Sequence, residues 1–215
     1  MYYDLFKLKK ALNMEKYSLK DLALYYEKFD GYVCEIMTNF GLLRFKFTVE
    51  NFPHLIGMQY AFKERKGGHK YKGRRGFEKV KNGEVTYEQM KKSVTKSANM
   101  NIAWKNIDLR IKFLPMFLNS ITKKTLLKTT IGIKDPERAT YIKGSYFLYR
   151  ELHDGKTLMF SIKRINKTGT VIETFIVDDD KSIIRNLYPI KIKSIKLIAP
   201  LQNTKPIFEK DEHLV

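Results

Sequence analysis

Apolar residues at the start of the chain recur with the period of a helix. Leu5, Leu8 and Leu12 share one helical face, and this spacing predicts helical structure through the first thirty residues. Ser18 fits the N-cap of a second helix because Asp21 stands at the capping-box distance. The chain therefore is expected to open with two short helices.

The pattern then changes to short runs rich in β-forming residues. Residues 32–37 and 42–49 are two such runs, and the turn sequence Thr38-Asn39-Phe40-Gly41 between them predicts a hairpin. Helical spacing returns over 86–96 and 102–121, where Pro115 is expected to kink or divide the second helix.

The last third of the chain is typical of an antiparallel sheet. Leu158, Phe160 and Ile162 alternate with Met159, Ser161 and Lys163, as in a strand buried on one face, and Lys191 and Lys193 alternate with isoleucines near the end. Glycine-containing turns separate the first three of the four predicted strands, 141–152, 157–165, 170–178 and 187–198.

These elements predict an α+β fold. N-terminal helices and a hairpin come first, followed by helices packed on a four-stranded antiparallel sheet. We expect residues 1–31 to form an N-terminal helical extension, residues 32–200 the main α+β domain, and residues 201–215 a loose tail.

The charge of the chain indicates its class of partner. Lysine and arginine number 41 against 23 acidic residues, a formal net charge of +18. Nucleic acid is the first polyanion that such an excess suggests, and an anionic membrane surface is the second. No apolar run approaches the roughly 20 residues of a membrane span, so no membrane partner is expected.

Cysteine usage and the N-terminus complete that classification. Met1–Lys10 lacks a signal-peptide pattern, and Cys34, the single cysteine, can form neither an internal disulfide nor a zinc cluster with four scattered histidines. We therefore predict a cytoplasmic protein with no structural metal and no cofactor, in which Cys34 is a buried structural thiol rather than a nucleophile.

His54 is the leading candidate for chemistry near neutral pH. It stands between Pro53 and Leu55 in an apolar segment that Asn51 is predicted to cap as a short helix. A structural histidine at a helix start is the alternative interpretation, and the remaining histidines fit loop, turn and tail positions.

A basic, glycine-rich segment over 63–76 is predicted to be a loop that contacts phosphates, unless it is only a mobile surface loop. Its aromatic residue, together with Phe62, could stack on unpaired bases. The residues expected to bind RNA are Lys63, Arg65, Lys66, Lys70, Tyr71, Lys72, Arg74 and Arg75, with Lys163 from the sheet.

Metal-independent RNA cleavage needs a base for the ribose 2′-hydroxyl, an acid for the leaving oxygen, and cations for the phosphoryl oxygens. The sequence supplies candidates for these roles on the long helix and the strands, although lysines on a sheet face are more often simply solvated. The candidate catalytic set is His54, Arg110, Lys143, Tyr149 and Lys191.

Four segments in order resemble the phage-associated barnase–EndoU–colicin–RelE-like nucleases, in particular the fourth of their named families. They are Phe52-Pro53-His54-Leu55-Ile56-Gly57-Met58, Leu109-Arg110-Ile111-Lys112-Phe113-Leu114, Ile142-Lys143-Gly144-Ser145-Tyr146-Phe147-Leu148-Tyr149 and Leu187-Tyr188-Pro189-Ile190-Lys191. The resemblance covers roughly residues 45–198. It implies helices packed on an antiparallel sheet, RNA as the substrate, His54 in catalysis and Arg110 as a phosphate contact.

Three functions follow as hypotheses. The first is a metal-independent endoribonuclease, a phage or mobile-element toxin or effector that leaves a 2′,3′-cyclic phosphate and is restrained by a protein or RNA antitoxin. The second is a non-catalytic nucleic-acid-binding protein, such as a phage regulator or an inhibitor of a host nucleic-acid-guided defence system. The third is a structural protein of a phage particle, which predicts no salt-dependent RNA binding.

Overall fold

The computed structural model describes residues 10–62, 68–94, 100–122, 129–134, 145–164, 170–179, 181 and 183–200. Within them the chain forms the α-helices α1 (Leu19–Glu27), α2 (Phe52–Leu55), α3 (Met58–Ala61), α4 (Gly73–Lys81), α5 (Tyr87–Val94) and α6 (Met100–Thr122). Three short 3-10 helices cover Val49–Asn51, Gly68–Tyr71 and Ile184–Asn186. The strands are β1 (Val33–Thr38), β2 (Gly41–Lys46), β3 (Thr129–Lys134), β4 (Tyr146–Glu151), β5 (Thr157–Arg164), β6 (Thr170–Asp178), β7 (Leu187–Ile190) and β8 (Ile192–Ile198).

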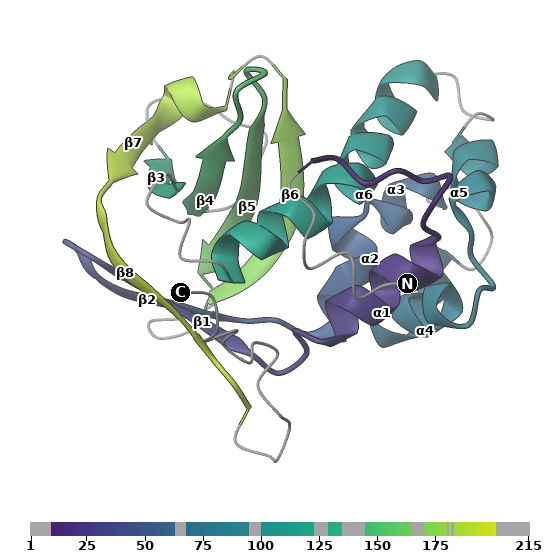
Figure 1. Ribbon diagram of the computed structural model, residues 1–215, viewed down its shortest axis with the longest axis horizontal. Helices are drawn as coiled ribbons and strands as arrows, with labels where there is room; N and C mark the ends of the chain where they lie inside the picture. The colour runs from purple at the N-terminus through teal and green to yellow at the C-terminus, as the bar shows by residue number, and fades with distance from the viewer. Residues whose placement is uncertain are drawn as a thin grey trace, which may run out of the picture.

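The predicted α+β class is confirmed, but the four-stranded antiparallel sheet is wrong. The described strands form one mixed sheet of eight in the order β7-β3-β4-β5-β6-β2-β1-β8. The predicted hairpin, β1 and β2, joins this sheet through a parallel pairing of Phe45 on β2 with Thr170 on β6. The run expected as one last strand is divided at Lys191, and its halves β7 and β8 occupy the two edges of the sheet. Because one residue connects the two edges, the sheet curls back on itself (Figure 1).

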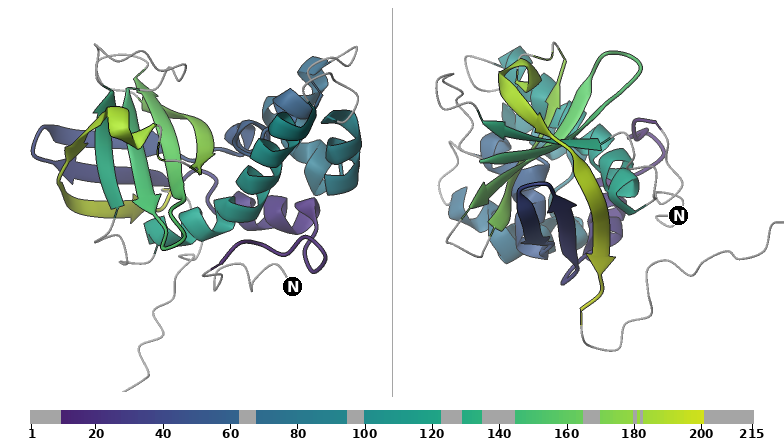
Figure 2. Two further views of the ribbon diagram at one scale, coloured as in Figure 1. Left: turned by 90° about the horizontal axis from the view of Figure 1, so that it is seen from above. Right: turned by 90° about the vertical axis from the view of Figure 1, so that its left-hand side faces the viewer.

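The helices gather on one side of the sheet, where α2 and α6 contact β6, and α6 runs from that group to the sheet itself (Figure 2). Phe117 of α6 packs edge-on against Phe160 of β5, with ring centroids 4.7 Å apart, and also contacts Phe175 of β6. α6 continues through Pro115 without being divided. This helix therefore joins the helical group to the sheet in a single hydrophobic core.

The N-terminal helix shows how local sequence fixes one element of this core. The Ser18 hydroxyl accepts a hydrogen bond from the Asp21 amide at 3.1 Å, and the Asp21 carboxylate accepts one from the Ser18 amide at 2.9 Å. The predicted capping box is therefore confirmed. α1, which was predicted to belong to the extension of residues 1–31, contributes buried residues to the same core as the strands. Leu12 is buried there too, but the residues from Lys10 to Ser18 are not helical, and Leu5 and Leu8 lie outside the described residues.

β5 is buried on both faces over most of its length, where the alternation predicted burial on one. Leu158, Phe160 and Ile162 belong to the main core, whereas Met159 packs in a second cluster with Phe147 of β4. The segment around the 3-10 helix Ile184–Asn186 covers that second face, because Ile183 and Leu187 join the same cluster. A residue that alternation alone would place in solvent is thus buried by a segment distant in sequence.

Candidate active site

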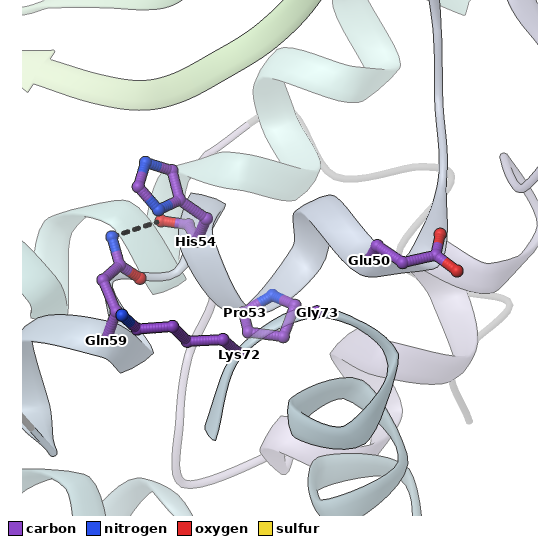
Figure 3. A pocket seen from close by; sticks show the side chains of 6 residues that line it. All are labelled: Glu50, Pro53, His54, Gln59, Lys72 and Gly73. Carbon is purple, nitrogen blue, oxygen red and sulfur yellow. Dashed lines mark hydrogen bonds between the residues drawn. The ribbon is translucent and has the colours of Figure 1, made fainter. Parts of the chain in front are cut away.

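His54 lies on α2, which packs against β6 of the sheet. β6 is also the strand that pairs with β2, at Thr170 and Phe45. Phe52, Leu55 and Ile56 turn into the core and are fully buried, which leaves His54 half-buried at the helix surface. The imidazole ring points away from Pro53 and Glu50 (Figure 3). The apolar neighbours therefore anchor the segment and orient the one residue in it that can exchange protons.

A pocket of about 310 Å³ opens beside His54. Besides the histidine, its lining consists of Glu50, Pro53 and Gln59 together with Lys72 and Gly73 at the start of α4. The Lys72 side chain extends toward Gln59 in Figure 3. The Gln59 amide nitrogen donates to the His54 carbonyl oxygen at 3.4 Å, so α3 is tied to the histidine segment. The pocket is large enough for a phosphate group, and its lining includes a histidine residue and a lysine.

The pocket's basic side was predicted to be a loop over 63–76, and its described part is helical instead. Gly68–Tyr71 is a 3-10 helix, and Arg74 and Arg75 stand in the first turn of α4. Gly76 permits this packing, because a Cβ there would lie 2.6 Å from the Tyr71 carbonyl and 3.0 Å from the Pro53 ring. The close approach of α4 to the Tyr71 backbone and the Pro53 ring places Lys72 next to α2.

Electrostatics at His54 favour the neutral imidazole. Burial lowers the pKa of His54 below its usual value, and the positive charges of Arg110 and Lys72 lower it further, while Glu173 opposes them. The ring is consequently uncharged at neutral pH and can accept a proton.

Arg110 reaches this site from α6. Its guanidinium donates to the Thr174 hydroxyl of β6 at 3.1 Å and lies over the Tyr60 ring, 5.3 Å from the ring centroid. Gly57, with a φ of 76°, turns the chain between α2 and α3, and a Cβ there would be 3.0 Å from Ile107 and 3.6 Å from the Arg110 side chain. The glycine therefore allows α6 to approach closely enough to bring Arg110 to His54.

Sequence reasoning missed two members of the site, Glu173 and Tyr60. Glu173 on β6 accepts a hydrogen bond from the Ser161 hydroxyl of β5 at 3.0 Å, and its charge acts on His54. The Tyr60 and His54 ring centroids are 6.4 Å apart. A lone carboxylate in an otherwise uncharged stretch of strand was the available signal for Glu173, but pattern alone cannot show that β6 packs against α2.

The predicted RNA-binding residues differ in how free their charges are to meet a ligand. Lys70, Lys72 and Arg75 are exposed near the pocket. Arg74 is held by Glu50, whose carboxylate oxygen lies 2.9 Å from both Nε and Nη2 of the guanidinium. Burial raises the pKa of Glu50, but hydrogen bonds from its own backbone and from Thr48, together with Arg74, lower it overall. Part of the Arg74 charge is thus neutralised within the protein.

The two aromatic residues that were predicted to stack on unpaired bases are packed on each other in the structure. Phe62 is buried, and its ring stacks on Tyr71 with centroids 4.1 Å apart. One face of Tyr71 is therefore occupied by Phe62, and Phe62 itself is inaccessible to a base.

The structure does not group the other candidates with His54. Tyr149 on β4 packs against the second cluster, and Lys163 is exposed near the end of β5. Lys191 is exposed between β7 and β8, which are separated from β6 by other strands in both directions. Four of the predicted residues, Lys63, Arg65, Lys66 and Lys143, lie outside the described residues.

Neither a metal-binding cluster nor a membrane-spanning helix is found in the described part of the chain. No three or more histidine, cysteine or acidic side chains within it are arranged to hold a metal ion. Among the helices of those same residues, none is both long and apolar enough to cross a membrane.

Comparison with known protein families gives a match over most of the chain. A family model described as phage-Barnase-EndoU-ColicinE5/D-RelE like nuclease 4 (PBECR4) matches residues 18–214, which include every element described above. No curated protein and no solved structure matches the chain.

Proposed function

The chain belongs to the phage-Barnase-EndoU-ColicinE5/D-RelE like nuclease 4 family, and from this premise we propose that it is a metal-independent endoribonuclease. The observation that carries the proposal is a half-buried histidine, His54, that lines a pocket together with Lys72. Burial and the charges of Arg110 and Lys72 lower the pKa of this histidine. The net charge of +18 supports a polyanionic substrate.

In the proposed reaction His54 acts as the general base. Its neutral imidazole takes the proton of a ribose 2′-hydroxyl, and that oxygen attacks the adjacent phosphorus. The bond from phosphorus to the 5′-oxygen of the next nucleotide breaks. The products are a 2′,3′-cyclic phosphate on one fragment and a 5′-hydroxyl on the other.

Arg110 and Lys72 supply the other two roles that the reaction needs. Arg110, which is fixed by Thr174, neutralises the charge that gathers on the phosphoryl oxygens. Lys72 lines the pocket and donates its ammonium proton to the leaving 5′-oxygen. His54 then loses its added proton to solvent and Lys72 regains one, which restores the starting state.

Tyr149 and Lys191, which were predicted as catalytic candidates, are given no role in this step. Lys143 lies outside the described residues and stays a catalytic candidate on the sequence alone. For the biological role we propose a toxin or effector of a phage or mobile element that acts in the cytoplasm. An active ribonuclease of this kind needs restraint, so a protein or RNA antitoxin is the expected partner.

Total RNA incubated in excess EDTA tests the catalytic proposal. Wild type should cut RNA and leave 2′,3′-cyclic phosphate ends, and DNA should stay intact because it lacks the nucleophile. His54→Ala should lose roughly 10²- to 10⁴-fold in rate, the usual contribution of a general base, while still binding RNA. His153→Ala, at an exposed turn, is the matched control and should cut like wild type.

Salt-sensitive RNA binding without cleavage by any variant would instead favour the non-catalytic regulator or inhibitor. Cleavage that is equal in wild type and His54→Ala would retain a nuclease but reject this site.

A further inference from the structure

Tyr60 is an aromatic side chain left in solvent at the candidate site. Its exposed fraction is 51%, whereas most of the large aromatic side chains that the structure describes are buried. It stands on α3, one residue beyond the pocket-lining Gln59. Core packing does not explain this position, because a half-exposed ring removes less apolar surface from water than a buried ring does.

The ring is also held in place from one side. The Arg110 guanidinium lies 5.3 Å from its centroid, in cation–π geometry, and is itself fixed by a hydrogen bond to Thr174. Tyrosine has few rotatable bonds, so a ring restrained in this way loses little further entropy when a ligand stacks on it.

We propose that Tyr60 is a nucleobase subsite, on which an unpaired base next to the cleaved phosphate stacks on the ring face opposite Arg110. The inference rests on the proposed function and names its substrate class: single-stranded or looped RNA, with little preference for base identity. Every base has a π face that such a platform accepts. Bases within a duplex are stacked on their neighbours and cannot present that face to a protein.

The surroundings of the ring suit this substrate. The His54 and Tyr60 centroids are 6.4 Å apart with planes inclined by 42°, so a base on Tyr60 brings its own ribose and phosphate to the imidazole. The guanidinium that lies over Tyr60 belongs to Arg110, the residue to which the proposed reaction assigns the phosphoryl oxygens. A base stacked on Tyr60 therefore fixes which phosphate of the RNA strand lies next to His54. Duplex RNA cannot be positioned in this way, because its bases are already stacked on one another.

Fluorescence anisotropy with a probe that cannot be cut separates binding from cleavage. The probe is a short fluorescein-labelled oligonucleotide of mixed sequence with 2′-fluoro in place of every 2′-hydroxyl, used alone and annealed to its complement. Tyr60→Ala should weaken single-strand binding about 5- to 150-fold, the range measured for loss of one stacking platform, and should leave duplex binding unchanged. Tyr60→Phe keeps the ring and should bind like wild type.

Tyr188→Ala is the matched control, because Tyr188 is 60% exposed but lies on β7 at the far edge of the sheet. Its single-strand affinity should equal that of wild type. Equal affinity of Tyr60→Ala and wild type, or equal losses on single strand and duplex, would overturn the subsite even if the protein cuts RNA. A single-strand defect confined to Tyr60→Ala would uphold it even if no variant cuts RNA.

Discussion

Replacing Gly76 by alanine sets two effects of similar size against each other. Gly76 lies inside α4, where alanine is favoured over glycine by about 1 kcal/mol. The added Cβ, however, would lie 2.6 Å from the Tyr71 carbonyl carbon and oxygen and 3.0 Å from Pro53 Cγ. Two of these neighbours are backbone atoms, so α4 and the 3-10 helix before it must separate by several tenths of an ångström.

Overpacking of this kind costs roughly 1–3 kcal/mol. Two of the three close neighbours are backbone atoms, so we expect a cost of about 2–3 kcal/mol, in the upper half of that range. After the helix-propensity gain of about 1 kcal/mol is subtracted, Gly76→Ala should lower the free energy of unfolding by about 1–2 kcal/mol. That loss corresponds to a decrease of about 2–8 °C in Tm for a chain of this size. The same displacement moves Lys72 away from His54, so kcat/KM for RNA should fall as well.

Urea unfolding followed by circular dichroism measures the change in stability, and RNA cleavage measures the change in activity. Arg75→Ala, at an exposed position of the same helix, controls for the stability measurement alone and should stay within about 0.5 kcal/mol of wild type. A Gly76→Ala protein as stable as wild type, or more stable, would show that helix propensity outweighs the contact and would refute the packing argument.

The other predictions concern titration. The cleavage rate should fall as pH decreases through the lowered pKa of His54, because the base must be neutral. Glu173→Gln removes a charge that raises this pKa, so the fall in rate should move to lower pH. Arg110→Met removes a charge that lowers the pKa, so the fall should move to higher pH. If both variants shifted the pH profile of kcat/KM in the same direction, His54 would not be the group that titrates. Burial raises the pKa of the fully buried Cys34 thiol, so a thiol reagent should label it only after unfolding, and stoichiometric labelling of the native protein would contradict its burial.

Local sequence determined many of the elements. The capping box at Ser18, the β1–β2 hairpin and the bounds of β6 were all predicted, because each depends on residues close together in the chain. The buried state of Cys34 was predicted as well and is confirmed. His54 was identified from its residue type, its apolar neighbours and the resemblance of its segment to a nuclease family.

The prediction of a loop over 63–76 is wrong for residues 68–76, which are largely helical. Part of the reason lies in the sequence nearby. Its glycines and lysines suggested an irregular chain, yet Phe77 and Val80 are buried and give α4 a face to pack. Packing of an amphipathic face outweighed the weak helix propensity of glycine. Arg74 and Arg75 therefore stand on a helix beside the pocket.

Only the tertiary structure decided how the sheet closes and what surrounds His54. The alternation of apolar and polar residues along β7 and β8 is the same whether they form one strand or two strands at opposite edges. The strand order was therefore decided by pairing between distant segments. Arg110, Glu173 and Tyr60 stand on three different elements, α6, β6 and α3. Packing of α2 against β6 and of α3 against α6 brings them to one histidine. Local pattern records which face of an element is apolar, whereas the partner of that face is chosen by the fit of the whole core.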